Sequence, residues 1–445
     1  VAVKGKEAPQ KVFELVTKSD VDSRIEASAT RGLTRFVGRE NSIAALMDAY
    51  NQVKLGSGQV VGIVGEAGVG KSRLVLEMQK RLSLDAHTWL EGRCIHYGGE
   101  MAYLPILDII RTCFGIDEGD REFVIKKKLE EKINALDAGL ENKLPSFQAL
   151  LSVKIDDPNY MQLEPAVRKN RAFEAIRDLL ILVADNRPIV AVVEDLHWMD
   201  KTSEDFLKFL IDSLPGTRIM LILLYRPEYV HQWGSKSYYT KIGLDQLGTA
   251  SSAELVQAIL EGGEAVPELK DLVLRKAGGN PLFVEEITHS LIENGYVQRK
   301  NHEYILTRSA SEIQVPDTVQ GIISARLDRV EESLKRIMQV ASVIGREFAF
   351  RILQSITGLK EDLKSCLLNL QGLEFIYEKQ LFPELEYIFK HALTQEVAYS
   401  SLLLKRRKEI HEKIGGVIEE LYAERLEEYY EMLAYHYERS DNKEK

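Results

Sequence analysis

The sequence has little cysteine, no long apolar run and no excess of positive charge. Cys94, Cys113 and Cys366 are too few and too scattered for a disulfide framework or a zinc site, so we expect reduced thiols in a cytoplasmic protein. No apolar run reaches the roughly 18 residues of a transmembrane helix. The net charge of −10 argues against a surface that coats nucleic acid. The chain begins with Val1, without a signal peptide, and we expect a segment of a longer protein.

The residues that are present are typical of a globular protein. Hydrophobic residues make up 45% and charged residues 28% of 445 residues, a length sufficient for about three domains. From Phe36 to about Leu247, apolar β-branched segments alternate with helical patterns. This alternation predicts a parallel sheet with helices on both faces. The strands are expected at residues 59–64, 87–91, 188–194 and 218–225.

A phosphate-binding loop follows the first of these strands. Residues 65–72 read GEAGVGKS, a complete G-x-x-x-x-G-K-[ST] loop before a helical pattern. Its glycines let several backbone N–H groups point at one phosphate, and the helix adds its positive end. We expect Lys71 to reach the β- and γ-phosphates of ATP and the Ser72 hydroxyl to hold Mg²⁺. The residues expected here to bind ATP or ADP are Gly65, Glu66, Ala67, Gly68, Val69, Gly70, Lys71, Ser72 and Arg73.

The strand expected at 188–194 runs into two adjacent carboxylates, Glu194 and Asp195. At the carboxyl end of a parallel strand, both can face the crevice where ligands bind. We assign Glu194 to Mg²⁺, through water, and Asp195 to polarising the water that attacks the γ-phosphate. The two roles are interchangeable on the sequence alone.

Other candidates lie close to the ends of the last two strands. Arg226 follows the fourth strand and can sense the γ-phosphate; the alternative is a surface arginine that caps a loop. His197 and Trp198 follow the acids, and we expect Leu196 and Trp198 to pack under the sheet; the alternative is a catalytic role for the His197 imidazole. Asp200 is expected to cap the next helix.

The second half of the chain is mainly helical. Residues 251–295 contain short helical segments broken at two glycine pairs, and residues 296–307 are expected to form a small hairpin. The glycine pairs are Gly262-Gly263 and Gly278-Gly279.

A second hairpin is expected within a later helical region. Asp317 is a candidate N-cap for the helices that follow it, and residues 374–390 form the hairpin candidate. Helices followed by a hairpin are typical of a winged helix. From about Leu402 an amphipathic pattern suggests the start of a repeat array.

These motifs, in this order, resemble the STAND class of P-loop NTPases, signal-transduction ATPases with numerous domains that are related to AAA+ and origin-recognition ATPases. The resemblance covers residues 35 to about 410. It implies an α/β P-loop NTPase domain followed by a helical lid, a winged-helix domain and the start of an α-helical repeat region. It rests on the segments FVGRE (36–40), GEAGVGKSRL (65–74), VVEDLHWMD (192–200), LLYRPE (223–228) and GNPLF (279–283).

The resemblance also implies further contacts with the nucleotide. In that family, the residues matching Val37, Gly38 and Arg39 lie near the adenine and ribose. Those matching Asn280 and Pro281 lie in the lid near the base and link nucleotide state to lid position.

His391 matches a histidine that touches the β-phosphate of ADP from the family's winged-helix domain. The match is loose, because the usual Met-His-Asp is here Phe-Lys-His-Ala (389–392). The alternative is a histidine on a winged-helix face.

The first residues resemble a different family. Residues 1–16 are similar to the closing strands of class III adenylate/guanylate cyclase domains, but the cyclase metal aspartates are not in this chain, so it cannot itself make a cyclic nucleotide. We therefore expect a cyclase remnant, a linker, a P-loop domain, a lid, a winged helix and the start of a tetratricopeptide-like array. Their expected boundaries are 1–16, 17–34, 35–247, 248–300, 301–401 and 402–445.

The expected function is that of an ATPase switch. The chain would bind Mg-ATP, hydrolyse it slowly, and regulate a linked upstream cyclase domain, downstream repeats or protein partners, with self-association on activation. The alternative is an origin-recognition-like or transcription-regulator ATPase that acts on DNA through its winged helix. The only dense basic cluster is KRRK at 405–408, and acidic residues share its segment, so nucleic acid is not the expected partner.

Overall fold

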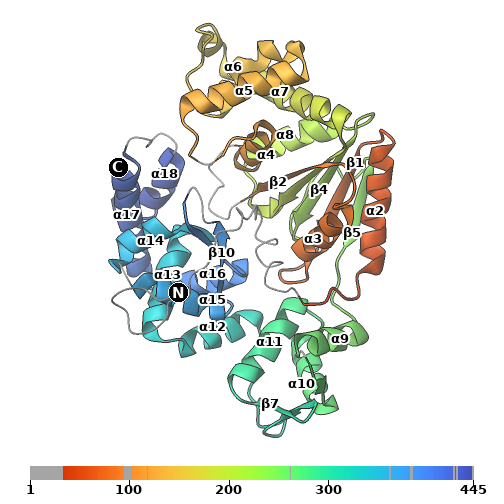
Figure 1. Ribbon diagram of the computed structural model, residues 1–445, viewed down its shortest axis with the longest axis vertical. Helices are drawn as coiled ribbons and strands as arrows, with labels where there is room; N and C mark the ends of the chain where they lie inside the picture. The colour runs from red at the N-terminus through yellow and green to blue at the C-terminus, as the bar shows by residue number, and fades with distance from the viewer. Residues whose placement is uncertain are drawn as a thin grey trace, which may run out of the picture.

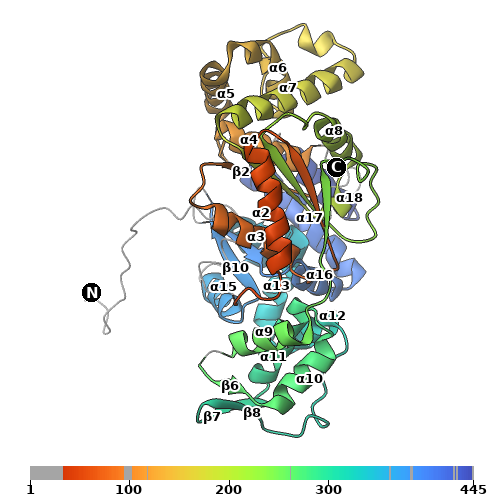
Figure 2. The same ribbon diagram turned by 90° about the vertical axis from the view of Figure 1, so that its right-hand side faces the viewer.

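A computed structural model describes most of the chain after Thr34 (Figures 1 and 2). The expectations for residues 1–16 and 17–33 lie outside the described residues. We refer below to a sheet part (34–247), a middle part (249–306) and a C-terminal part (319–442). The described residues are 34–94, 103–117, 119–260, 262–359, 362–380, 384–423, 426 and 429–442.

The sheet part is built on five parallel strands in the order β2-β3-β4-β1-β5. The four predicted strands are confirmed to within two residues. The fifth, β5, was not predicted because it is an edge strand that pairs only with β1 and buries only Ile242. The strands are β1 (Gln59–Val64), β2 (Thr88–Arg93), β3 (Ile189–Glu194), β4 (Ile219–Tyr225) and β5 (Tyr239–Gly243).

Helices cover both faces of this sheet, as predicted. Successive residues of a strand face opposite sides, so Val61 packs with α2 and α3, whereas Val60 lies in the core with α4, α7 and α8. Burial on both faces explains why the central strands are apolar along their whole length. The covering helices are α2 (Glu40–Lys54), α3 (Lys71–Leu82), α4 (Leu104–Phe114), α7 (Pro165–Asn186) and α8 (Lys201–Asp212).

Additional short helices lie between α4 and α7, at the end of the molecule farthest from the middle part (Figure 1). They are α5 (Glu122–Leu136), η1 (Ala138–Lys143), α6 (Leu144–Leu150) and η2 (Tyr160–Gln162). No helix in the described part of the chain is both long and apolar enough to cross a membrane.

The middle part has its own apolar core and a small sheet of order β6-β8-β7. The predicted hairpin is confirmed. The predicted break at Gly278-Gly279 is also confirmed, because both residues have positive φ and a Cβ on Gly279 would lie 2.4 Å from the Leu247 carbonyl oxygen. The elements are α9 (Thr249–Ile259), β6 (Glu264–Ala265), α10 (Pro267–Ala277), α11 (Pro281–Glu293), β7 (Val297–Lys300) and β8 (Glu303–Leu306).

The C-terminal part combines helices with a three-stranded antiparallel sheet of order β10-β11-β9 around one apolar core. The hairpin predicted at 374–390 is confirmed as β10 and β11. The elements are α12 (Val319–Arg329), α13 (Glu332–Ile344), β9 (Glu347–Ala349), α14 (Phe350–Thr357), α15 (Asp362–Gly372), β10 (Ile376–Gln380), β11 (Glu386–Phe389), α16 (Ala392–Ser400), α17 (Leu404–Leu421) and α18 (Tyr430–Glu438).

The predicted N-cap at Asp317 is wrong by one residue. Thr318 caps α12, because its hydroxyl accepts a hydrogen bond from the backbone N–H of Gly321 at 3.0 Å. Asp317 instead accepts from Lys276 Nζ at 2.7 Å. Both residue types are good caps, and packing of the helix in the core decides where its first turn begins.

Candidate nucleotide-binding site

The loop between β1 and α3 has the backbone that a phosphate cradle requires. Gly68 and Gly70 have φ values of 80° and 99°, and Gly70 precedes the first residue of α3. The N–H groups in the first turn of a helix have no partner inside it and carry its positive dipole end. The strand–loop–helix context predicted for the motif is therefore confirmed, and it is suited to an anion.

Lys71 folds back over this loop. Its Nζ donates to the carbonyl oxygens of Gly65 at 2.7 Å and Glu66 at 3.1 Å. Burial lowers the pKa of Lys71, Arg226 lowers it further, and Asp195 and Glu194 oppose both effects. The ammonium group therefore interacts electrostatically with both predicted acids and with the arginine at the end of β4.

The two acids lie where β3 ends, as predicted. Glu194 is the last strand residue and its side chain is buried. Asp195 has a left-handed backbone with φ of 56°, which turns the chain sharply after the strand. Burial alone would lower the pKa of Arg93 on β2, but the charges of Glu347 and Glu194 raise it. Glu194 therefore lies close enough to Arg93 to interact with its charge.

Arg226 follows β4, which lies beside β3 as predicted. Its guanidinium carbon lies 5.7 Å from the centre of the Trp198 ring, and its Nη2 lies 3.9 Å from Glu396 Oε1 on α16. Trp198 packs against the apolar core, and Asp200 caps α8 by accepting from the Ser203 N–H at 2.8 Å, so both structural predictions are confirmed.

The middle part forms direct hydrogen bonds with the phosphate-binding loop. Asn280 Nδ2 donates to the Ala67 carbonyl at 3.0 Å, and the Leu282 N–H donates to the Gly68 carbonyl at 3.3 Å. Asn280 Oδ1 also accepts from the Phe283 N–H and caps α11, with Pro281 as first helical residue. Asn280 thus couples the start of α11 to the loop, and its contact with a base stays a prediction.

The predicted residues before α2 lie at the same junction. Val37 is buried in the core of the middle part, and a Cβ on Gly38 would lie 2.4 Å from Ser251 Oγ. Arg39 Nη2 donates to the carbonyls of Val69 at 3.3 Å and Asp245 at 2.6 Å. These residues tie the loop to the middle part, and their contact with adenine or ribose stays a prediction.

Arg73 and His391 occupy less direct positions. Arg73 Nη2 donates to the Thr34 carbonyl at 2.8 Å and to Glu77 Oε1 at 2.9 Å. His391 precedes the first residue of α16, a helix that places Leu393 in an apolar cluster with Leu282. The Leu282 N–H of α11 is hydrogen-bonded to the loop, so α16 is linked to the nucleotide site by its apolar contact with α11.

Sequence reasoning missed two charged residues of the C-terminal part that meet the site. Arg346 Nη1 donates to Asp195 Oδ2 at 3.3 Å, and Arg93 is ion-paired with Glu347. Lys379 Nζ donates to the same Glu347 at 2.7 Å. Arg346 belongs to no recognisable motif and lies 151 residues from Asp195, so no local signal in the sequence could have identified it.

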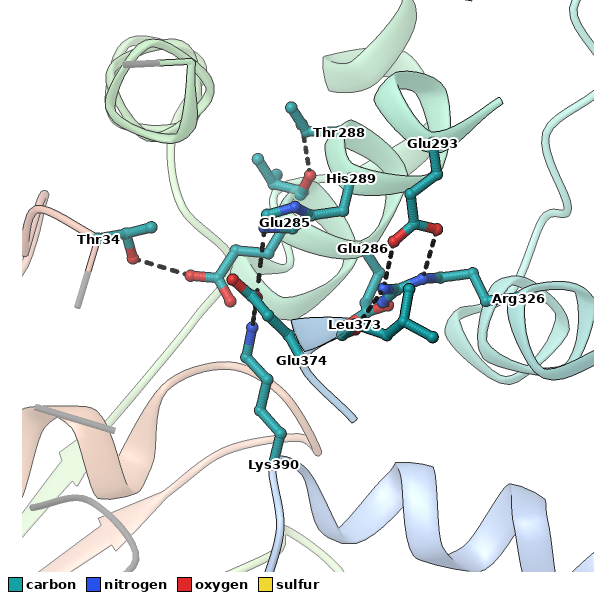
Figure 3. A network of polar contacts seen from close by, with 11 residues as sticks. Thr34, Glu285, Glu286, Thr288, His289, Glu293, Arg326, Leu373, Glu374 and Lys390 are labelled. Atoms are coloured by element: carbon teal, nitrogen blue, oxygen red, sulfur yellow. Dashed lines mark hydrogen bonds and ion pairs between the residues drawn. The ribbon is translucent and has the colours of Figure 1, made fainter. Parts of the chain in front are cut away.

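A network of charged side chains around the buried Arg326 joins the middle part to the C-terminal part (Figure 3). Arg326 on α12 donates to Glu286 at 2.5 Å and to both oxygens of Glu293 on α11, at 3.0 and 2.6 Å. It also donates to the Leu373 carbonyl at 3.2 Å, close to β10. Arg326 and Glu286 are 6% and 3% exposed, so this junction depends on complete pairing.

Figure 3 also shows a second group of contacts beside this network. Lys390 is ion-paired with Glu374, and His289 Nε2 lies 3.9 Å from the same carboxylate. On the same face of α11, one helical turn before His289, Glu285 Oε1 accepts a hydrogen bond from the Thr34 hydroxyl at 2.9 Å. Helix α11 is therefore held from both the start of the sheet part and the C-terminal part.

Two oxygen donors beside the loop fit a divalent metal that is bound together with a nucleotide. Among the described residues, no group of three or more His, Cys, Asp or Glu side chains could hold a metal ion. Mg²⁺ is usually bound by one or two protein oxygens together with substrate phosphates and water. The Ser72 hydroxyl and the Glu194 carboxylate would provide such oxygens beside the loop.

Comparison with known proteins agrees with this geometry. Residues 35–223 match the family model of the AAA ATPase domain. Such a domain implies nucleotide binding, usually with a divalent metal. The chain is 26% identical over 420 residues to an uncharacterized protein of Rhizobium meliloti (strain 1021), covering 93% of this chain and 40% of that protein.

Two solved structures align with most of this chain, and one of them has a similar fold. A Signal Transduction ATPase with Numerous Domains (STAND) protein with a tetratricopeptide repeat sensor, from Pyrococcus horikoshii, aligns with a TM-score of 0.51 at 13% identity, covering 91% of this chain and 48% of that one. The Aeropyrum pernix ORC1 protein in complex with DNA covers 83% of this chain and 94% of its own at 12% identity, but its TM-score of 0.35 is too low to support an inference. The chain thus spans less than half the length of the curated relative and of the STAND protein.

Proposed function

We propose that this chain is an ATP-binding, slowly hydrolysing switch of the STAND type. The observation that carries the proposal is the ion pair between Arg346 and Asp195, which joins the C-terminal part to one of the two predicted acids. The bond from Asn280 to the Ala67 carbonyl supports it, because the middle part contacts the loop itself. A nucleotide that occupies this loop will affect contacts of all three parts.

The ion pair provides a physical basis for inhibition. The side chains of Arg346 and Asp195 are 16% and 24% exposed, so the pair is partly shielded from water. A carboxylate that is neutralised by a guanidinium is a weaker acceptor for the proton of an attacking water. The closed arrangement would therefore hold hydrolysis low, and movement of Arg346 away from Asp195 would release the acid.

The roles in nucleotide binding follow from the same geometry. Lys71 would exchange its two loop carbonyls for phosphate oxygens, and Ser72 and Glu194 would hold Mg²⁺, whose charge offsets that of the phosphates. Arg226 would sense the γ-phosphate by giving up its contact with Glu396 and binding the phosphate instead. A switch requires such differential contacts with ATP and ADP.

The finer organisation belongs to the same proposal. The C-terminal part would include a winged-helix domain that closes over ADP, with His391 at the β-phosphate. Its output would pass to a linked cyclase domain, to helical repeats or to protein partners. The basic cluster at 405–408 gives little support to a DNA-binding role, since Glu409 and Glu412 lie on the same helix.

Single-turnover hydrolysis of ATP tests the ion pair. Asp195→Asn should lower the rate by at least about 100-fold while nucleotide binding persists, because an amide is a poor proton acceptor. Arg346→Gln should raise it by about two- to fivefold, the range expected for loss of a partly exposed ion pair. Arg351→Gln, an exposed arginine on α14, is the matched control and should leave the rate unchanged.

Two outcomes would contradict the proposal. Equal rates for Arg346→Gln and Arg351→Gln would mean that the ion pair does not restrain hydrolysis. Loss of nucleotide binding in Asp195→Asn would instead assign metal binding to Asp195 and exchange the roles of the two acids.

A further inference from the structure

A second concave site lies away from the phosphate-binding loop, between α16, α17 and the end of α18. It is a cavity of about 240 Å³ whose charged lining residues are Arg407, Lys408, Glu438 and Arg439. The ring of Tyr399 and the buried imidazole of His411 also line it. The lining carries three cations and one carboxylate, so the cavity has an excess of positive charge.

Aromatic rings contact both guanidinium groups, and backbone oxygens also hold that of Arg407 without neutralising it. The guanidinium carbon of Arg407 lies 4.7 Å from the centre of the Tyr399 ring, and that of Arg439 lies 4.2 Å from the Tyr435 ring. Arg407 also donates to the carbonyls of Leu402 at 2.8 Å and Ser400 at 3.3 Å. Such pre-organised arginines lose little conformational entropy when they bind an anion.

The carboxylates near the cavity compensate only part of this charge. Glu438 pairs with Arg439 at 2.6 Å, and Asp441 pairs with Lys408 at 2.6 Å. Their side chains are 52% and 70% exposed, and ion pairs at such exposed positions are weak, so an incoming anion can replace them. Among the described residues, no carboxylate forms an ion pair with Arg407.

The buried imidazole at the cavity agrees with a positive environment. Burial lowers the pKa of His411 to about 4, and the charges of Arg439 and Arg407 contribute in the same direction. His411 is therefore neutral near pH 7, and its Nδ1 shares a hydrogen bond of 2.8 Å with Nδ1 of His436. Because the histidine pair is neutral, it adds no charge to the three cations of the lining, whose excess positive charge favours a negative ligand.

We propose that this cavity binds a small phosphate-bearing anion and that binding is coupled to the nucleotide site through α16. Arginine side chains bind phosphate oxygens in pairs of parallel hydrogen bonds. A volume of about 240 Å³ lies below the roughly 300–1,000 Å³ typical of drug-sized ligands, so the site suits a phosphate group or small phosphorylated molecule better than a nucleotide.

Helix α16 provides the link to the ATP-binding loop. Tyr399 lines the cavity, and Glu396, three residues earlier on the same helix, lies 3.9 Å from Arg226 at the end of β4. Residues three apart are neighbours on a helix surface. Displacement of α16 by a bound anion would therefore change the contact of Glu396 with Arg226; this coupling rests on the switch function proposed above, whereas anion binding itself does not.

Calorimetric titration with inorganic phosphate, at constant ionic strength, tests the binding site. The titration uses the Lys71→Ala background, so that the phosphate-binding loop does not contribute. Arg407→Gln and Arg439→Gln should each weaken binding at least about tenfold, since a hydrogen bond to a charged group contributes about 1.5–3 kcal/mol. Arg407→Lys should retain part of the affinity, and Arg406→Gln, a neighbour outside the cavity, should retain all of it.

Two results would contradict the proposed binding site. One is an absence of phosphate binding in the Lys71→Ala background, and the other is an equal affinity of Arg407→Gln and Arg406→Gln for phosphate. Tight binding of a DNA duplex that Arg407→Gln and Arg406→Gln weaken equally would show a polyanion surface instead of a cavity.

Release of a fluorescent ADP analogue tests the coupling separately. With unlabelled ADP in excess, phosphate cannot enter the occupied loop. Phosphate should nevertheless change the release rate of the otherwise unmodified protein about fivefold or more, and Arg407→Gln should abolish this effect. Phosphate binding without any change in ADP release would overturn the coupling through α16 and leave the site itself intact.

Discussion

At the scale of single residues, Lys71 joins the backbone of its own loop to the charges of the candidate nucleotide-binding site. Its Nζ holds two loop carbonyls, and Asp195 and Glu194 lie in the same field. These hydrogen bonds fix the position of the lysine, which lowers the entropic cost of ordering it around a phosphate. No carboxylate in the described part of the chain forms an ion pair with Lys71, so its charge is available for phosphate.

Lys71→Ala should abolish stabilisation by ATP. A ligand at about 100 times its dissociation constant stabilises the folded state by roughly 2.7 kcal/mol, which raises the melting temperature of a domain of this size by about 2–4 °C. Lys80→Ala in the last turn of the same helix, where the side chain is 46% exposed, should keep the full increase. An equal increase in both variants would place the nucleotide elsewhere.

At the scale of elements, the junction of α11 and α12 depends on one buried arginine. Arg326 pairs with Glu286 and Glu293, and its guanidinium carbon lies 4.9 Å from the centre of the Phe375 ring. Removal of one member of a buried charge network leaves the others uncompensated. The network therefore determines how firmly the middle part is attached to the C-terminal part.

Arg326→Ala should reduce the free energy of unfolding by about 3–5 kcal/mol, because it leaves Glu286 buried without its partner. Arg329→Ala, exposed on the same helix, should change it by no more than about 0.5 kcal/mol. Chemical denaturation compares the two. If the double variant Arg326→Met, Glu286→Leu is as unstable as Arg326→Ala, packing rather than charge pairing holds the junction.

At the scale of the whole molecule, three parts that are distant in the sequence meet around the phosphate-binding loop. Asn280 contacts the loop from the middle part, and Arg346 and Glu396 reach the ends of β3 and β4 from the C-terminal part. These contacts are few, polar and partly exposed. By contrast, the cores of the three parts are apolar and continuous, so the contacts at the loop are the ones most readily exchanged.

His391→Ala should accelerate ADP release and favour an open or associated form of the chain. A hydrogen bond to a charged group is worth about 1.5–3 kcal/mol, so release should be at least about tenfold faster. His302→Ala, an exposed histidine in the hairpin of the middle part, is the control. Release rates and mass in solution that match the control would assign His391 to packing and leave Asn280 as the principal contact of the lid.

Local patterns predicted much of the fold. The glycines and Lys71 of the loop, the apolar strands β1, β3 and β4, and the cap at Asp200 depend on neighbours within a few residues, and all were recognisable in the sequence. Strand β5 was not, because an edge strand with one buried side chain carries no apolar signature. The cap at Thr318 was misplaced by one residue because two adjacent residues can serve equally well.

By itself, the sequence determined the chemistry of the candidate site: a phosphate cradle, a lysine, a hydroxyl and two carboxylates, each defined by spacing along one segment. Only the tertiary structure decided which groups from distant segments contact these residues. The contacts of Arg346 with Asp195, of Glu396 with Arg226 and of Asn280 with Ala67 join residues from different parts of the chain. Such pairs have no periodicity or motif, because their geometry is set by how the apolar cores orient whole elements. The proposed switch rests on these pairs.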